Sequence, residues 1–306
     1  MINKMKKSTK ALIAAVGAGA VGAAAAQYAY IFVRPPRITA KLHRKSSHEN
    51  EYYVRRDAAA AALDAHPCTR HSITSARGET LQGFYYQSGA VPSKRIAFIV
   101  HGYHSDHLRA AGMFADFYFS QGIDIFCCDN VASGESGGRL IGYGIYESAD
   151  CLNWLSYLKA TYGEDIRVMM HGFSMGGATV LRMSDRAPDC VKCIVSDSGF
   201  SSAHDILYAR IGALTYIMDG INRLVARYSI NSADVRNNVR AARVPILFVH
   251  GREDMVVPFD MGVELYSICP GSKDYLWVDE ARHVESIYAA PEQYTAKLAE
   301  FTGKYL

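Results

Sequence analysis

Short apolar runs alternate with segments of helical periodicity from residue 71 to the C-terminus. The first two runs, residues 71–75 and 81–87, flank Arg77-Gly78-Glu79 and predict a hairpin. The other runs predict strands at 95–100, 123–128, 166–170, 193–195, 245–249 and 275–278. Segments of helical spacing lie between them, at 108–121, 146–162, 178–186, 261–269 and 291–305. This alternation is typical of an α/β fold in which helices cover both faces of a mostly parallel sheet.

Residues 200–243 lie between the predicted strands 193–195 and 245–249 and carry apolar side chains at helical spacing. Such a stripe usually packs into a core, so we predict a small helical insert, with a lid over a pocket as the alternative. Several arginines in the same stretch are expected to form a solvated face rather than to bind an acidic group.

The N-terminal 33 residues have a different pattern. Four lysines precede an uncharged run from Ala11 to Val33, and Arg34 follows it. These 23 residues would extend about 34 Å as a helix, which exceeds a bilayer core of about 30 Å. We therefore predict that residues 1–33 form a single-pass membrane anchor, with a secretory signal cleaved near residues 24–26 as the alternative.

The predicted anchor is followed by a basic linker and lead-in helix over residues 34–70, and then by the main domain, residues 71–306. Basic residues lie on both sides of the predicted span, so the membrane side stays open. The signal-like start favours export of the domain. The seven cysteines form no disulfide framework and favour a reducing compartment.

The composition argues against several functional classes. The net charge is only +3 and no basic stripe crosses the main domain, so nucleic acid is not an expected partner. Cys190-Val191-Lys192-Cys193 has no second pair at zinc spacing, so no metal site is expected. The chain contains neither a dinucleotide fingerprint nor a P-loop, and no cofactor is expected.

Two copies of the pattern G-x-S-x-G occur, centred on Ser136 and Ser174. Ser174 follows the predicted strand 166–170 and precedes a helical segment, and this strand–turn–helix context exposes a nucleophilic hydroxyl. Ser136 lies in a glycine-rich stretch where no helix begins, so we expect it in a flexible loop at the pocket rim. Ser174 is therefore the predicted nucleophile.

A serine nucleophile needs a base and a group that orients the base. Among eleven histidines, His283 is the predicted base because it follows the last predicted strand. Asp254 follows the strand 245–249 and is the predicted acid. Its neighbour Glu253 is expected to point elsewhere. Asp197, after the preceding strand, is the alternative acid.

An oxyanion hole needs two N–H donors aimed at the developing negative oxygen. Met175 follows the nucleophile, and its backbone N–H is the first predicted donor. Tyr103, in the loop after the strand 95–100, supplies the second. Gly102 lets this loop approach the substrate closely, and His101 is expected to brace the loop rather than to act as a second base.

Together these motifs resemble the α/β-hydrolase superfamily over residues 71–306. The resemblance is carried by residues 100–106, 172–177, 250–254 with 257–258, and His283. Residues 129–130, 134–137, 144 and 147, with the N-terminal segment, resemble bacterial membrane-anchored serine hydrolases of the serine aminopeptidase-like or esterase-like kind. Those proteins often carry Arg and His after the aspartate, where this chain has Val131-Ala132-Ser133, so the contacts of that loop are not carried over.

The predicted activity is hydrolysis through an acyl-enzyme, with a small-molecule acyl compound as the substrate. Because the insert is short, we expect an open or modestly covered pocket for small to medium acyl groups. A carboxylic ester is the first choice, a peptide or amide the second and a thioester the third. A non-catalytic, membrane-tethered binding module is the alternative from another class, and the oligomeric state stays open.

Overall fold

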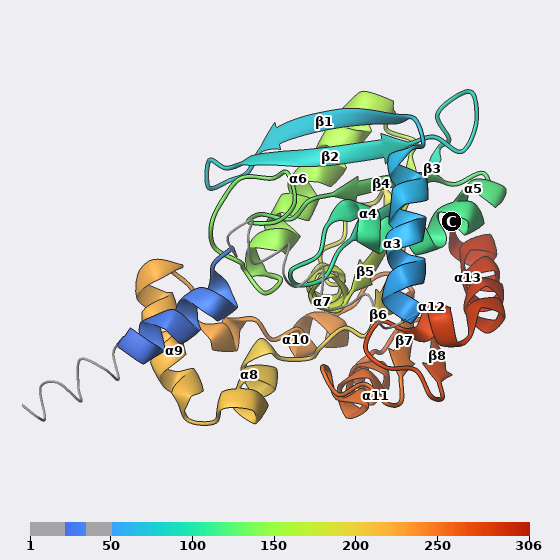
Figure 1. The fold of residues 1–306 in the computed structure, drawn as a ribbon. Helices are drawn as coiled ribbons and strands as arrows, with labels where there is room; N and C mark the ends of the chain where they lie inside the picture. Colours follow the sequence, from blue (N-terminus) through green and yellow to red (C-terminus); the bar gives the residue numbers. More distant parts are fainter. Residues whose placement is uncertain (1–21, 35–50) are drawn as a thin grey trace, which may run out of the picture.

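A computed structural model describes residues 22–34 and 51–306. One sheet contains β1 (Cys68–Thr74), β2 (Thr80–Tyr86), β3 (Arg95–Val100), β4 (Asp124–Cys128), β5 (Arg167–Phe173), β6 (Val191–Asp197), β7 (Ile246–Gly251) and β8 (Lys273–Val278). The strand order is β1-β2-β4-β3-β5-β6-β7-β8 (Figure 1). β1 and β2 form an antiparallel hairpin, β2 is antiparallel to β4, and all other neighbours are parallel. The predicted hairpin and mostly parallel sheet are confirmed.

Helices cover both faces of this sheet, as predicted. The α-helices from residue 51 onwards are α3 (Glu51–Asp64), α4 (His107–Ala111), α5 (Ala115–Ser120), α6 (Ile145–Tyr162), α7 (Met175–Arg182), α8 (Ala203–Ile211), α9 (Leu214–Val225), α10 (Arg236–Arg240), α11 (Phe259–Ile268), α12 (Ser286–Ala289) and α13 (Pro291–Tyr305), of which α8 and α9 lie to the side of the sheet (Figure 1). In β3, Phe98 belongs to a core that includes α6 and α7, and the adjacent Ile99 to a core that includes α5 and α13. Alternate side chains of a central strand are thus both buried, which is why these strands are continuous apolar runs in the sequence.

Helix α3 packs closely on the segment between α4 and α5 (Figure 1). A Cβ at Gly112 would lie 2.7 Å from the backbone of Ala59 and Ala60, so the contact requires glycine. Leu63 of α3 is buried, and the Tyr52 hydroxyl donates to the carbonyl of Val284 at 3.2 Å. The start of α3 therefore reaches the loop that carries His283.

The segment predicted to span a membrane is in part a helix that packs on the domain. Residues 22–32 are helical, and Tyr28, Ile31 and Phe32 are buried in the core that also contains α6 and α7. The Tyr28 hydroxyl donates to Asn222 Oδ1 of α9 at 3.0 Å. The apolar side chains at this end of the predicted span therefore contact protein.

Over residues 22–34 and 51–306, no helix is both long enough and apolar enough to cross a bilayer. The prediction of a single-pass anchor, and of a membrane location based on it, was therefore wrong. The rest of the predicted span, residues 11–21, lies outside the described residues.

Candidate active site

Ser174 occupies the sharp turn between β5 and α7. Its backbone has φ 53° and ψ −115°, a conformation that is strained for a residue with a Cβ. A Cβ at Gly172 would lie 2.1 Å from the carbonyl oxygen of Gly176, and one at Gly176 would lie 2.0 Å from that of Val100. The two glycines of the motif are thus required for the turn that holds Ser174 beyond the sheet.

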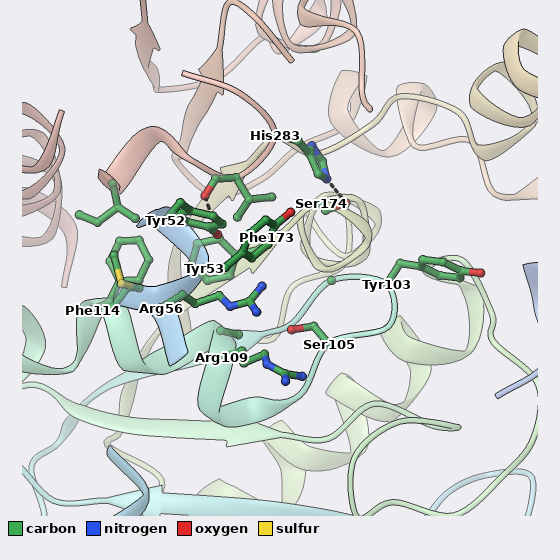
Figure 2. A pocket seen from close by; sticks show the side chains of 15 residues that line it. Tyr52, Tyr53, Arg56, Tyr103, Ser105, Arg109, Phe114, Phe173, Ser174 and His283 are labelled. Atoms are coloured by element: carbon green, nitrogen blue, oxygen red, sulfur yellow. Dashed lines mark hydrogen bonds between the residues drawn. The ribbon is translucent and has the colours of Figure 1, made fainter. Parts of the chain in front are cut away.

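Ser174, His283 and Asp254 are brought together from the carboxyl ends of β5, β8 and β7. His283 Nε2 lies 2.8 Å from Ser174 Oγ (Figure 2), and His283 Nδ1 lies 2.7 Å from Asp254 Oδ2. The imidazole can therefore accept the serine proton at Nε2 while Nδ1–H donates to the carboxylate. The His283 side chain is 19 % exposed, so a substrate can reach it.

Both oxygens of the buried Asp254 carboxylate have partners. Oδ1 accepts the N–H groups of Val256 and Val257 at 2.8 Å each, and Oδ2 also lies 3.3 Å from His250 Nε2. Burial alone would raise the pKa of Asp254, but the hydrogen bonds from His250, His283 and Val257 hold it well below its ordinary value. The carboxylate therefore stays ionised. His250 was missed by the sequence analysis, although it belongs to the same motif as Asp254.

Asp197, the alternative acid, has other partners. Its Oδ1 accepts from Ser198 Oγ at 2.9 Å, and its Oδ2 accepts from the Tyr294 hydroxyl at 3.1 Å. Burial raises the pKa of Asp197 to about 6, against the effect of these two hydrogen bonds. Within the part of the chain that the structure describes, the His283 ring is hydrogen-bonded to Asp254 and not to Asp197.

The loop after β3 lies directly against the turn at Ser174. A Cβ at Gly102 would lie 3.2 Å from Ser174 Cβ, a close approach that favours glycine. Buried His101 accepts the Asn130 backbone N–H at Nε2, 2.9 Å away, and its Nδ1 lies 2.7 Å from the Gly102 carbonyl. These contacts agree with a bracing role for His101.

The predicted oxyanion donors, Tyr103 and Met175, both line space next to Ser174. Among the described residues, neither backbone N–H donates to a backbone carbonyl. Both N–H groups are thus available to a ligand oxygen. The Tyr103 hydroxyl has another role: it donates to the carbonyls of Tyr30 and Ile31 in the N-terminal helix.

Ser136, the centre of the second G-x-S-x-G, is buried rather than at a pocket rim. Its Oγ donates to the Asp129 carbonyl at 2.6 Å and accepts the Gln82 N–H at 2.9 Å. The Asp129 carboxylate in turn accepts from His107 and from the Glu135 N–H. The expectation of a flexible loop at the rim was wrong, because this network fixes the serine inside the fold.

Two cavities meet at Ser174. The apolar cavity, of about 290 Å³, lies on the Met175 side and is lined mostly by apolar side chains, among them Ile31, Phe200, Ile206 and Leu207, with Arg210 as its one charged lining residue among those described. The arginine cavity, of about 230 Å³, lies on the His283 side and is lined by Tyr52, Tyr53, Arg56, Ser105, Arg109 and Phe114, among others. Tyr103 borders both.

Most of these lining residues lie outside the motifs that can be recognised in the sequence. Arg56 lies in α3, which was interpreted as a lead-in helix, and Ile31 lies in the predicted anchor. No local motif marks either residue, because each comes to line a cavity at Ser174 only through packing between distant segments.

Known proteins resemble this chain over most of its length. The prolyl oligopeptidase family matches residues 118–306. Protein YqkD of Bacillus subtilis is 24 % identical over 242 residues, which are 76 % of this chain and 78 % of that protein. The esterase Pf2001 of Pyrococcus furiosus superposes with a TM-score of 0.65 at 24 % identity, covering 79 % of this chain and 93 % of the esterase. Est1E of Butyrivibrio proteoclasticus, solved with ferulic acid, superposes with a TM-score of 0.63 at 18 % identity, covering 76 % of this chain and 98 % of Est1E. The predicted α/β-hydrolase fold is confirmed.

Proposed function

The chain belongs to the prolyl oligopeptidase family and is a hydrolase, and from this premise we propose that it cleaves carboxylic esters by a serine mechanism. The observation that carries the proposal is the hydrogen-bonded chain from Ser174 Oγ through His283 to Asp254, with two cavities open to the serine. Acyl transfer needs an activated serine, a base that is oriented to take its proton, and an ionised acid that holds the base.

In the first step Ser174 Oγ attacks the substrate carbonyl while His283 Nε2 takes the hydroxyl proton. The N–H groups of Tyr103 and Met175 stabilise the resulting oxyanion, a contribution of about 3 kcal/mol per donor. His283 then gives the proton to the leaving oxygen, and the carbon–oxygen bond breaks. In the second step water, deprotonated by His283, attacks the acyl-enzyme and releases the carboxylic acid and Ser174.

The lining of the apolar cavity supports an acyl group of small to medium size as the substrate moiety. The esterases among the superposed structures also support an ester. Peptide or amide cleavage is the second candidate, because the family match is to prolyl oligopeptidases.

The test is labelling by a fluorophosphonate probe, followed by turnover of matched p-nitrophenyl esters and p-nitroanilides. We expect the wild type to be labelled and Ser174→Ala to be unlabelled. Ser136→Ala, which changes the other G-x-S-x-G serine, should stay labelled. Labelling that persists in Ser174→Ala would refute the nucleophile, and faster cleavage of the anilides would replace the ester by the amide.

A further inference from the structure

The two cavities differ in which part of the catalytic machinery lines them. His283 lines the arginine cavity, whereas Met175 lines the apolar cavity. The leaving oxygen must receive its proton from His283 Nε2, so the leaving group has to occupy the side of Ser174 on which His283 lies. The acyl group then occupies the apolar cavity. This assignment rests on the proposed function.

The arginine cavity has a cationic wall. Arg56 of α3 and Arg109 of α4 line it, and no carboxylate does so among the described residues. Figure 2 shows Arg56, Ser105 and Arg109 near one another on one side of the cavity, below Ser174 and His283 in the view. The two arginine side chains are each 19 % exposed, so they are partly shielded from solvent screening.

The counter-charges of these arginines lie outside the cavity lining and hold the guanidinium groups in place. Asp57 Oδ1 accepts from Arg56 Nη2 at 2.9 Å and from Arg109 Nε at 3.4 Å, so both cations share one carboxylate oxygen. Asp106 Oδ2 accepts from Arg109 Nη1 at 3.0 Å. Arg56 also stacks over the Tyr53 ring, 4.8 Å from its centroid.

These contacts leave one terminal nitrogen of each guanidinium without a partner in the part of the chain that the structure describes. Within the described residues, Arg56 Nη1 and Arg109 Nη2 donate no hydrogen bond. A planar guanidinium that is already oriented binds carboxylate and phosphate oxygens with little loss of side-chain entropy. Two such groups in one small cavity match a single anionic group on a ligand.

We propose that the leaving group of the substrate carries an anion, a carboxylate or a phosphate, which Arg56 and Arg109 bind while Ser174 attacks the adjacent ester. The reaction is unchanged: the carbon–oxygen bond of the ester breaks, and the leaving alcohol takes the proton from His283. The anion itself is not transformed. Arg56 and Arg109 select the substrate and hold its leaving oxygen next to His283.

The test compares three butyrate esters that differ only at one ring position of the leaving phenol: 3-carboxyphenyl, 3-phosphonophenyl and the neutral 3-carbamoylphenyl butyrate. Each kcat/KM is divided by the rate of spontaneous hydrolysis of the same ester. We expect the wild type to prefer an anionic ester over the neutral one by about tenfold or more, as for a charge-assisted hydrogen bond. The faster of the two anionic esters identifies the anion.

Arg56→Gln and Arg109→Gln should each reduce this preference while the neutral ester is still cleaved. Arg55→Gln is the matched control, because Arg55 is adjacent on α3, pairs with Glu51 and does not line the cavity. Added sodium chloride should also reduce the preference of the wild type, a measurement that needs no variant.

Equal rates for charged and neutral esters in the wild type would overturn the proposal, as would a preference that survives both substitutions or is insensitive to salt. In each of these cases the esters are still cleaved and the proposed function stands. A wild type that cleaves none of the three esters refutes the proposed function instead.

Discussion

The Asp254 carboxylate accepts two backbone N–H groups and lies against two imidazoles, whereas the Asp197 carboxylate accepts only two hydroxyls. Asp197 is the last residue of β6, Asp254 lies just after the neighbouring strand β7, and both are buried. Burial raises the pKa of both carboxyls; at Asp254 the imidazoles and N–H groups outweigh it and lower the pKa, whereas at Asp197 the two hydroxyls do not.

Asp254→Asn should reduce kcat/KM for p-nitrophenyl butyrate by about 10⁴-fold, because an amide cannot stabilise the imidazolium or hold the productive tautomer. Asp197→Asn should leave kcat/KM nearly unchanged, since its amide oxygen can still accept from Tyr294. Steady-state kinetics of both variants give the comparison. A loss in Asp197→Asn as large as that in Asp254→Asn would contradict the assignment of the acid.

The raised pKa of Asp197 predicts a pH-dependent stability. The pKa is about 6 in the folded protein against an ordinary value of 3.8, so the folded state binds more protons than the unfolded state between these values. The contribution of the protonated Asp197 carboxyl to the free energy of unfolding is complete below pH 4. It is lost as the pH rises through 6, which lowers the free energy of unfolding by up to about 3 kcal/mol.

Urea unfolding at pH 4 and pH 7 measures this effect. The free energy of unfolding of the wild type should include a loss between pH 4 and pH 7 that is absent in Asp197→Asn, because the asparagine side chain does not ionise. Wild-type and variant stabilities that change in parallel with pH would show that Asp197 does not titrate in this window.

Two helices outside the sequence motifs form walls of the two cavities. The N-terminal helix, residues 22–32, borders the apolar cavity, and α3 borders the arginine cavity. The Tyr103 hydroxyl ties the N-terminal helix to the loop that carries a predicted oxyanion donor. Acyl-chain preference should therefore depend on this helix.

Deleting residues 1–33 should flatten the dependence of kcat/KM on acyl-chain length. Each methylene buried against the wall contributes about 0.8 kcal/mol, or about fourfold in kcat/KM. The measurement is the ratio of kcat/KM for p-nitrophenyl hexanoate to that for the acetate. Tyr103→Phe, which removes only the hydroxyl contact, should lower the ratio less. A ratio unchanged by the deletion would exclude the helix from acyl binding.

At the scale of the whole molecule, one sheet between two helical layers buries nearly all of the thiols. Cys68, at the start of the edge strand β1, is exposed, and the other six cysteines are buried and unpaired. Burial raises the pKa of Cys193 to about 12 and that of Cys127 well above its ordinary value, so these thiols are unreactive in the folded state.

A thiol reagent should therefore modify one cysteine rapidly in the native protein and all seven in guanidinium chloride. Cys68→Ser should abolish the rapid phase, because it removes the exposed thiol. The release of thionitrobenzoate from Ellman's reagent counts the groups. More than one rapidly reacting thiol in the native wild type would mean that one of the two cores opens readily.

The features that the sequence by itself determined are local ones. The continuous apolar runs of the central strands and the glycines around Ser174 can be recognised within short segments, because they depend on backbone geometry and on neighbouring residues, and the order of serine, aspartate and histidine can be read along the chain. From these, the sheet and the helical layers were predicted correctly. The structure also brings Ser174, Asp254 and His283, the three predicted catalytic residues, within hydrogen-bond distance of one another.

Only the tertiary structure decided what depends on packing between distant segments. An apolar run has the same pattern whether lipid or protein covers it, so residues 22–33 were mistaken for part of a membrane anchor until Tyr28 and Phe32 were seen buried in the fold. Asp197 ends β6 and Asp254 lies three residues after β7, and only long-range contacts place one of them at His283. Arg56 lines the cavity next to Ser174 only because α3 packs on the main domain, and no short stretch of sequence encodes that packing.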